Sequence, residues 1–346
     1  MDFKSPPKVV SLASELASFG NFGYATCPPS LVDSVIRRCL ELYDWKIEKN
    51  WLVWLPGMVC ALNVTCRAFE NQSSQVITQT PIYPPFLSAP GNFGLPCTRV
   101  PMVLDSDRFS FDFDALDRLT TKPHDLFMLC HPHNPVGTSF TRDELERLSR
   151  WVCERDLYLC SDEIHCDLLL EPEDKHLPFA SLSPALADRV ITLMAPSKTF
   201  NLPGFGCSYA IIANSDIRRG FKKAMSGIVP DPPAMGFALA DSAYRHGEPW
   251  RLQLLNYLRA NRDFAMEGLS TINGLTPYSP EATYLLWLDA RELPVENAHS
   301  FFEKAGVGLS DGRDFGAPGF LRMNLGCRRD LLGNALERMI AACNLL

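Results

Sequence analysis

The 346-residue sequence lacks several features that define whole classes of protein. No apolar run approaches the roughly 20 residues that a membrane-spanning helix needs, and Met1–Lys4 have no apolar signal-peptide core. No basic block stands out, and the net charge is −7. A nucleic-acid partner is therefore disfavoured, because phosphate binding needs clustered Lys and Arg. A membrane partner is not expected either.

The twelve cysteines include no C-x-x-C pair, and their closest spacings are six and seven residues. We therefore expect no zinc site, no other metal and no disulfide framework. Several cysteines stand in apolar runs, where a reduced thiol serves as a small hydrophobe. This usage predicts a cytoplasmic protein, and 46% hydrophobic with 21% charged residues is typical of a globular one.

Short apolar runs alternate with helical patterns through the middle of the chain. Six runs predict strands: Gln75–Gln79, Val100–Leu104, Leu126–Cys130, Leu157–Ser161, Val190–Met194 and Ser208–Ala213. Several are apolar almost throughout, as strands buried on both faces are. Between two of them, Thr141–Arg155 begins with an N-cap and a Glu three residues later, which predicts a helix. This alternation favours a mostly parallel α/β sheet.

The pattern changes towards the C-terminus. A stretch rich in Pro, Ala and Gly, residues 230–247, interrupts it, and a long helix is predicted from Pro249 to Leu269. Further strands are predicted at Ala282–Asp289 and Phe320–Leu325, and helices at Val295–Ala305 and Arg329–Leu345. We therefore expect an N-terminal segment over residues 1–30, a large domain over 31–245 and a small α+β domain over 246–346.

Lys198 stands in a small, hydroxyl-rich turn directly after the predicted strand Val190–Met194. An exposed loop lysine is the ordinary interpretation of such a position. The alternative is a Schiff-base lysine, because partial burial lowers the pKa of the ammonium and leaves a nucleophilic amine. Ser197 beside it has a hydroxyl that suits a phosphate.

Two other polar residues follow predicted strands in the same way. Asp162 directly follows the predicted strand Leu157–Ser161, and the carboxyl ends of strands are where open α/β sheets bind ligands. Asn134 lies between two prolines after the predicted strand Leu126–Cys130. Alone, Asp162 is equally consistent with a solvated loop acid or a helix N-cap, and Asn134 with an ordinary turn. Together with Lys198 they are expected at one edge of the sheet.

The sequences around these three residues are H-N-P-V-G, S-D-E-I and S-K-T-F-N, separated by 28 and 36 residues. They resemble the class I/II aminotransferase superfamily of fold-type I pyridoxal-phosphate enzymes. The resemblance implies an α/β fold with a large, mostly parallel-sheet domain and a smaller C-terminal α+β domain. It also implies that Lys198 carries pyridoxal 5′-phosphate as a Schiff base, that Asp162 keeps the ring nitrogen protonated, and that Asn134 bonds the ring oxygen.

The same resemblance points to the residues around the cofactor. The turn with Gly57, Met58 and Val59 resembles the helix N-terminus that presents N–H groups to the cofactor phosphate. Tyr83 matches the aromatic residue that stacks on the ring, and His165 is expected beside the cofactor.

Two more residues match family positions at the substrate. Arg322 resembles the arginine that grips the substrate α-carboxylate, which a guanidinium can bind bidentately; a surface ion pair is its ordinary interpretation. Tyr24 resembles a tyrosine that reaches the cofactor phosphate of the other subunit and helps to place the substrate. This match implies a homodimer with a shared active site.

Finer motifs resemble the cystathionine β-lyase branch of the MalY/PatB type. Gly206 stands where many aminotransferases have a phosphate-binding Arg, eight residues after the lysine, and His165 stands where many have Tyr. The run S-K-T-F-N-L-P-G and the starting M-D-F-K-S-P-P also resemble that branch. Its members usually have further residues before M-D-F, so segment 1–30 is expected to be a shortened one.

The resemblance implies β-elimination from L-cystathionine or a related cysteine S-conjugate, giving thiol, pyruvate and ammonia. Lys198 would remove the Cα proton as general base, while Arg322 fixes the carboxylate. An aminotransferase acting on an L-amino acid is the alternative, because it uses the same lysine, acid and arginine. A non-catalytic regulatory protein that binds pyridoxal phosphate is a more distant one.

Overall fold

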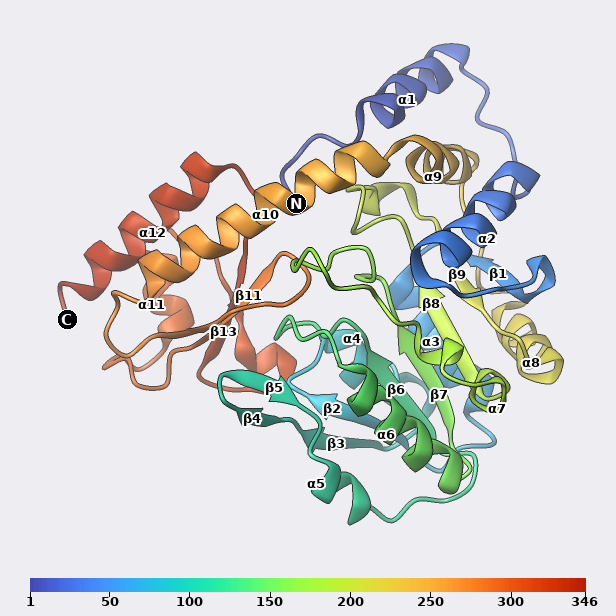
Figure 1. Cartoon of the computed structure of the whole chain (residues 1–346), viewed down its shortest axis with the longest axis horizontal. Helices are drawn as coiled ribbons and strands as arrows, with labels where there is room; N and C mark the ends of the chain where they lie inside the picture. Colours follow the sequence, from blue (N-terminus) through green and yellow to red (C-terminus); the bar gives the residue numbers. More distant parts are fainter.

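The computed structural model describes residues 1–346, and its main element is a seven-stranded sheet in the order β1-β9-β8-β7-β6-β2-β3 (Figure 1). From β8 to β3 neighbouring strands run parallel, whereas β9 pairs antiparallel with both β1 and β8. The prediction of a mostly parallel α/β sheet is confirmed. Its strands are β1 (Leu52–Leu55), β2 (Val76–Thr80), β3 (Cys97–Pro101), β6 (Leu126–Cys130), β7 (Tyr158–Asp162), β8 (Val190–Met194) and β9 (Ser208–Ile211).

Five of the six predicted strands agree with the structure within two residues at either end. The prediction of one strand over Val100–Leu104 is wrong. The chain there leaves the edge strand β3 and enters β4 (Val103–Asp105), which pairs with β5 (Arg108–Ser110) in a separate hairpin. Met102 separates the two strands, and its side chain is buried, so the apolar run continues across the break.

Helices cover both faces of the sheet. Successive residues of β6 alternate between two cores, because strand side chains point to opposite faces. Phe127 and Leu129 pack in the core that includes α2, α6 and α9, while Leu126, Met128 and Cys130 pack in the core of α3 and α8. The helices here are α2 (Pro29–Tyr43), α3 (Met58–Phe69), α4 (Pro84–Ser88), α5 (Phe113–Asp117), α6 (Arg142–Glu154), α7 (Pro184–Ala187), α8 (Ser215–Met225) and α9 (Ala234–His246).

Helix α9 corrects the expectation that residues 230–247 only interrupt the pattern. Its small residues are needed for close packing. A Cβ at Gly236 would lie 2.3 Å from the Phe205 carbonyl oxygen, and Ala240 and Ala243 are fully buried. Small residues at a close contact therefore gave this helix the composition of a loop.

The C-terminal part forms a second layered unit around an antiparallel sheet of order β10-β11-β13-β12. The long helix α10 (Glu248–Leu269) runs from the large sheet to this unit (Figure 1). The predicted α+β character is confirmed, while the division at residues 245 and 246 stays a prediction. The remaining elements are β10 (Thr276–Tyr278), β11 (Leu285–Asp289), α11 (Ala298–Lys304), β12 (Ser310–Asp311), β13 (Phe320–Asn324) and α12 (Arg329–Cys343).

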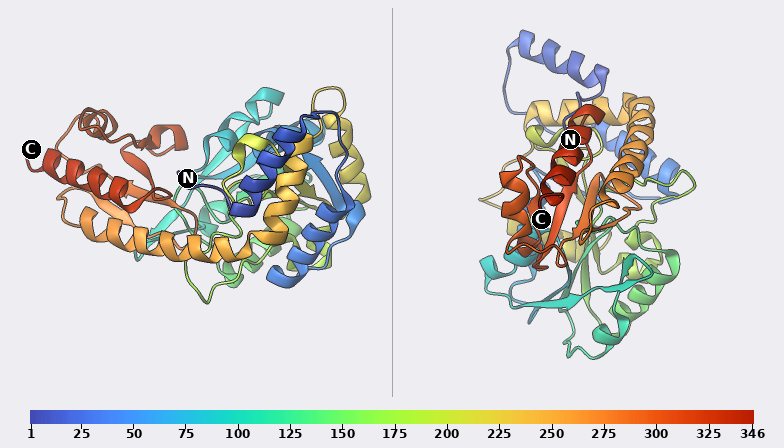
Figure 2. Two further views of the ribbon diagram at one scale, coloured as in Figure 1. Left: turned by 90° about the horizontal axis from the view of Figure 1, so that it is seen from above. Right: turned by 90° about the vertical axis from the view of Figure 1, so that its left-hand side faces the viewer.

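The N-terminal residues cross both parts of the molecule. The Asp2 N–H donates to the Gly326 carbonyl at 2.7 Å, and α1 (Pro7–Phe19) packs on α9 (Figure 2). Residues 20–26, between α1 and α2, are exposed and include Phe22 and Tyr24. None of the helices combines the length and the apolar character that crossing a membrane requires.

Candidate active site

One pocket of about 390 Å³ opens at the carboxyl edge of the large sheet. Asp162 ends β7 and pairs with Cys130 of β6 and Leu193 of β8. Asn134 and Lys198 lie just beyond the ends of these neighbouring strands, and all three residues line the pocket. The prediction that they share one sheet edge is confirmed, and the pocket has the size of a small-molecule site.

The pocket also brings together the other residues singled out in the sequence, except one. Tyr24 does not line it and is fully exposed in the α1–α2 connection. The predicted residues that line the pocket are Gly57, Met58, Val59, Tyr83, Asn134, Asp162, His165, Ser197, Lys198 and Arg322.

Asp162 is a buried carboxylate with few partners in the chain. It is 2% exposed, and its Oδ1 accepts a hydrogen bond from the Ile164 N–H at 3.1 Å. Burial raises the pKa of Asp162 to about 7, although that hydrogen bond and the charge of Lys198 act in the opposite direction. A cationic N–H from a ligand would restore the ionised form, so the site fits a protonated ring nitrogen.

The pKa of Lys198 is shifted in the opposite direction. Burial lowers its pKa, the carboxylate of Asp162 acts against this, and the positive charge of Arg322 adds to it. A larger share of this amine is therefore uncharged at neutral pH than in a solvent-exposed lysine. An uncharged lysine amine is the form that attacks an aldehyde or removes a proton.

Arg322 projects from β13 into the pocket without a carboxylate partner. Its Nη1 donates to Asn134 Oδ1 at 3.0 Å, its Nη2 donates to Ser310 Oγ at 3.2 Å, and its guanidinium lies over the Phe315 ring. These partners are neutral, and burial lowers the pKa of Arg322. The structure therefore rules out the surface ion pair and leaves a guanidinium that fits a ligand carboxylate.

The N-terminus of α3 supplies donors at another side of the pocket. Gly57 caps this helix without a side-chain hydrogen bond, and the first N–H groups of a helix have no acceptor within it. Together with the hydroxyl of Ser197, this end of α3 fits a phosphate. At Gly206, with φ of 55°, a Cβ would lie 2.9 Å from the Pro56 carbonyl oxygen, so this backbone leaves no room for an arginine.

His165 contributes a neutral imidazole to the pocket. It is 3% exposed, and its Nδ1 is buried without a hydrogen-bond partner. Burial, with smaller effects from the charges of Lys198 and Arg322, lowers its pKa to about 3. An orphaned buried nitrogen in a pocket wall fits a polar atom of a ligand.

Tyr284 and Asn324 are among the residues of this pocket that sequence reasoning did not predict as site residues. The ring of Tyr284 lies edge-on to His165 with centroids 6.0 Å apart. Asn324 was predictable, because it stands two residues after Arg322 on one strand and so shares its face. Tyr284 lies in the predicted strand Ala282–Asp289, but β11 begins only at Leu285, and the strand pattern did not mark Tyr284 as a pocket residue.

Comparison with known proteins places this architecture in a family. The model of the family "Aminotransferase class I and II" matches residues 2–339. The chain is 33% identical to cystathionine β-lyase PatB of Bacillus subtilis, over 99% of this chain and 90% of that protein. The chain belongs to the class I and II aminotransferase family, and its architecture is fold type I.

Two solved structures are similar to this chain over nearly its whole length. The crystal structure of OvoB is 43% identical, with a TM-score of 0.96, and the match covers 99% of this chain and 90% of that one. Cystalysin from Treponema denticola, which contains pyridoxal 5′-phosphate, is 30% identical with a TM-score of 0.94, over 99% and 89%. The resemblance to the MalY/PatB-type branch is confirmed by the curated relatives, since PatB and the protein MalY of Escherichia coli each match over 99% of this chain.

Proposed function

We propose that this chain is a pyridoxal-phosphate-dependent carbon–sulfur β-lyase. It cleaves L-cystathionine or a related cysteine S-conjugate to a thiol, pyruvate and ammonia. The observation that carries the proposal is that one pocket contains three groups. They are a lysine amine with a lowered pKa, a buried carboxyl group and an arginine without a carboxylate partner. The choice of a lyase is supported by the similarity to PatB, which is named a cystathionine β-lyase.

The pocket residues fit pyridoxal 5′-phosphate. When bound, this cofactor withdraws electrons from the Cα of an amino acid and so makes its proton removable. Lys198 would hold the aldehyde carbon, and Asp162 would hold the ring nitrogen. The remaining contacts would come from Asn134 and His165 at the ring's polar groups, Tyr83 on its face, and Ser197, Gly57, Met58 and Val59 at the phosphate.

The chain's own residues orient the substrate and move its proton. Arg322 binds the α-carboxylate, and its hydrogen bond to Asn134 fixes the plane of the guanidinium. Lys198 takes the Cα proton as general base, which its lowered pKa favours. His165, uncharged over the whole physiological range, offers one donor and one acceptor without changing the charge of the pocket.

The proposal extends to the assembly and the cell. We infer a homodimer in which Tyr24, exposed in this chain, reaches the active site of the partner. The large domain spans residues 31–245, the small domain 246–346, and a short segment 1–30 precedes them. Twelve unpaired cysteines fit a reducing, cytoplasmic location.

The test is to incubate the purified chain and pyridoxal phosphate with L-cystathionine and to assay pyruvate and free thiol together. Equal amounts of both are expected, and Lys198→Ala, the control, should give neither. A keto acid that keeps the substrate's carbon–sulfur bond, with no free thiol, would instead identify an aminotransferase. Full activity of Lys198→Ala would remove that residue from the mechanism.

A further inference from the structure

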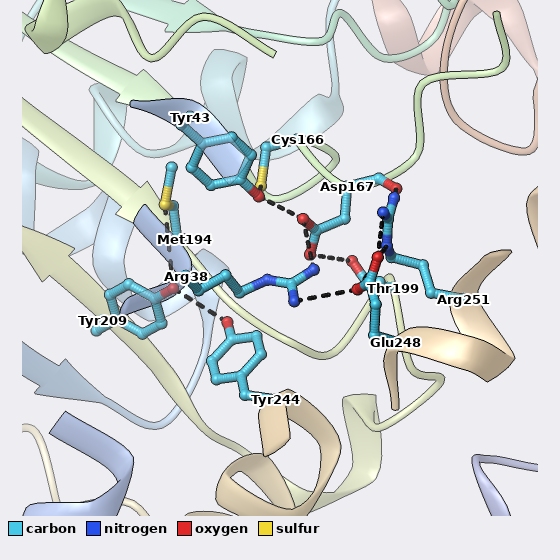
Figure 3. A network of polar contacts seen from close by, with 10 residues as sticks. All are labelled: Arg38, Tyr43, Cys166, Asp167, Met194, Thr199, Tyr209, Tyr244, Glu248 and Arg251. Carbon is cyan, nitrogen blue, oxygen red and sulfur yellow. Dashed lines mark hydrogen bonds and ion pairs between the residues drawn. The ribbon is translucent and has the colours of Figure 1, made fainter. Parts of the chain in front are cut away.

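Figure 3 shows a network of polar side chains that includes Thr199. Its centre is Asp167, which accepts a hydrogen bond from the Thr199 hydroxyl at 3.1 Å and pairs with Arg38 Nη2 at 2.8 Å. The Tyr43 hydroxyl donates to the same carboxylate. Thr199 is the residue directly after Lys198, so the network ends beside the reactive amine.

The centre of the network is closed to solvent and carries charge. Asp167 is 4% exposed, and Thr199 is fully buried. Burial pushes the pKa of Asp167 upward, but the charges of Arg38 and Arg251 and the hydrogen bond from Tyr43 outweigh it, so the pKa lies below its usual value. Asp167 is therefore an ionised carboxylate in the protein interior.

The network extends to two helices far apart in the sequence. Arg38 comes from α2, and its Nη1 lies 3.4 Å from Glu248 Oε2 at the start of α10. Arg251 of α10 donates to the backbone carbonyl of Asp167 at 2.9 Å. Arg38 and Tyr43 of α2 therefore hold the carboxylate of Asp167, while α10 holds its backbone.

Stability alone does not account for such a group. Removing two charges from water costs about as much as their contact returns, and apolar side chains often replace buried ion pairs without loss. A buried carboxylate that several donors hold instead fixes one arrangement of the network's members around it, although Arg38 Nε has no partner here. Here one of those members is the neighbour of Lys198.

We propose that Asp167 and Thr199, held by Arg38, form a clamp that positions the amine of Lys198 opposite Asp162. The inference rests on Lys198 being the reactive amine of the proposed function. Neither Asp167 nor Thr199 lines the pocket, so both act as positioning residues. The clamp also explains why polar residues stand at two positions that do not contact a ligand. They are Asp167, the last residue of S-D-E-I-H-C-D, and Thr199, the last residue of S-K-T.

The chain offers a matched pair of variants. Thr199→Val removes the hydroxyl that donates to Asp167 and nearly keeps the side chain's shape. Thr192 of β8 is also fully buried, but its hydroxyl makes no hydrogen bond, so Thr192→Val is the control for the substitution itself. Thr199→Ser keeps the hydroxyl and serves as the rescue.

The measurement is the rate at which pyridoxal phosphate attaches to the apoprotein, followed by absorbance as a function of pH. It reports the pKa of Lys198, on which the charges of Asp162 and Arg322 act, and it needs no sulfur substrate. We expect Thr199→Val to raise this pKa, because a loosened amine is better hydrated, and to slow attachment about tenfold, as misplaced reacting groups do. Thr192→Val and Thr199→Ser should match the wild type.

The clamp would be overturned if Thr199→Val and Thr192→Val showed the same pKa of Lys198 and the same rate of attachment. Asp167→Asn is the second variant and should shift the pKa of Lys198 in the same direction. A wild-type pKa in folded Asp167→Asn protein would equally overturn the clamp. Attachment that survives Lys198→Ala unchanged would instead overturn the proposed function and, with it, this inference.

Discussion

Single residues in the pocket are held away from their ordinary charge states by burial. Asp162 has a pKa of about 7, Lys198 has a lowered pKa, and His165 has a pKa of about 3. Each shift favours the uncharged form of its group before any ligand enters. The site is thus prepared for a ligand that brings its own charges, namely a phosphate, a ring cation and a carboxylate.

Asp162 makes the stability of the apoprotein depend on pH. Its folded pKa of about 7 lies above the ordinary value of 3.8, so its contribution is fully present below about pH 4 and is lost as pH rises through 7. Asp162→Asn removes this ionisation. We therefore expect the urea midpoint of the variant, relative to the wild type, to rise between pH 5 and 7.5. A difference that does not change with pH would contradict the buried, protonated carboxyl.

The pocket residues show how far single positions are readable from sequence. Asn134, Asp162 and Lys198 were predictable, because each follows an apolar run whose strand type fixes its edge of the sheet. The absence of a carboxylate partner for Arg322 was not predictable, because it depends on which loops fold against β13. Asp167 and Thr199 meet only through the fold, so no local pattern paired them.

At the scale of elements, the capping box of α6 is the clearest link between sequence and structure. The Thr141 hydroxyl accepts a hydrogen bond from the Glu144 N–H, and the Glu144 carboxylate accepts one from the Thr141 N–H at 2.7 Å. The helix was predictable because these contacts are local. The opposite case is α9, where packing against the Phe205 carbonyl, a distant contact, selects the small residues.

Thr141→Ala should lower stability without affecting chemistry. Loss of an N-cap hydroxyl costs about 1 kcal/mol, and α6 does not contribute to the pocket. A lower urea midpoint with unchanged kcat and KM is the expected result. A change in KM would show that α6 affects the site in a way that its contacts do not indicate.

At the scale of the whole molecule, the exposed connection between α1 and α2 is the main unexplained surface. Phe22 and Tyr24 are largely exposed there, as is Phe19 at the end of α1. Apolar rings that stay in contact with water are costly, and a second copy of the chain would cover them. This surface supports the proposed homodimer.

A shared site can be tested by complementation between two damaged chains. Lys198→Ala and Tyr24→Ala are co-expressed with different tags, and the heterodimer is purified. One of its two sites then has an intact Lys198 together with the partner's intact Tyr24. About half of the wild-type activity is expected, since one of two symmetric sites is complete. A heterodimer no more active than the Tyr24→Ala homodimer, or a monomer in ultracentrifugation, would refute the shared site.

Cys130 and Cys207 line the same pocket as Lys198, and this has a consequence for chemical selectivity. Burial raises the pKa of Cys207 to about 12 and the pKa of Cys130 well above its usual value. Both sulfurs therefore stay protonated and are poor nucleophiles, while the nearby amine is partly free of its proton. Under the proposed function, protonation alone thus keeps the protein's own thiols from competing with Lys198 for the aldehyde.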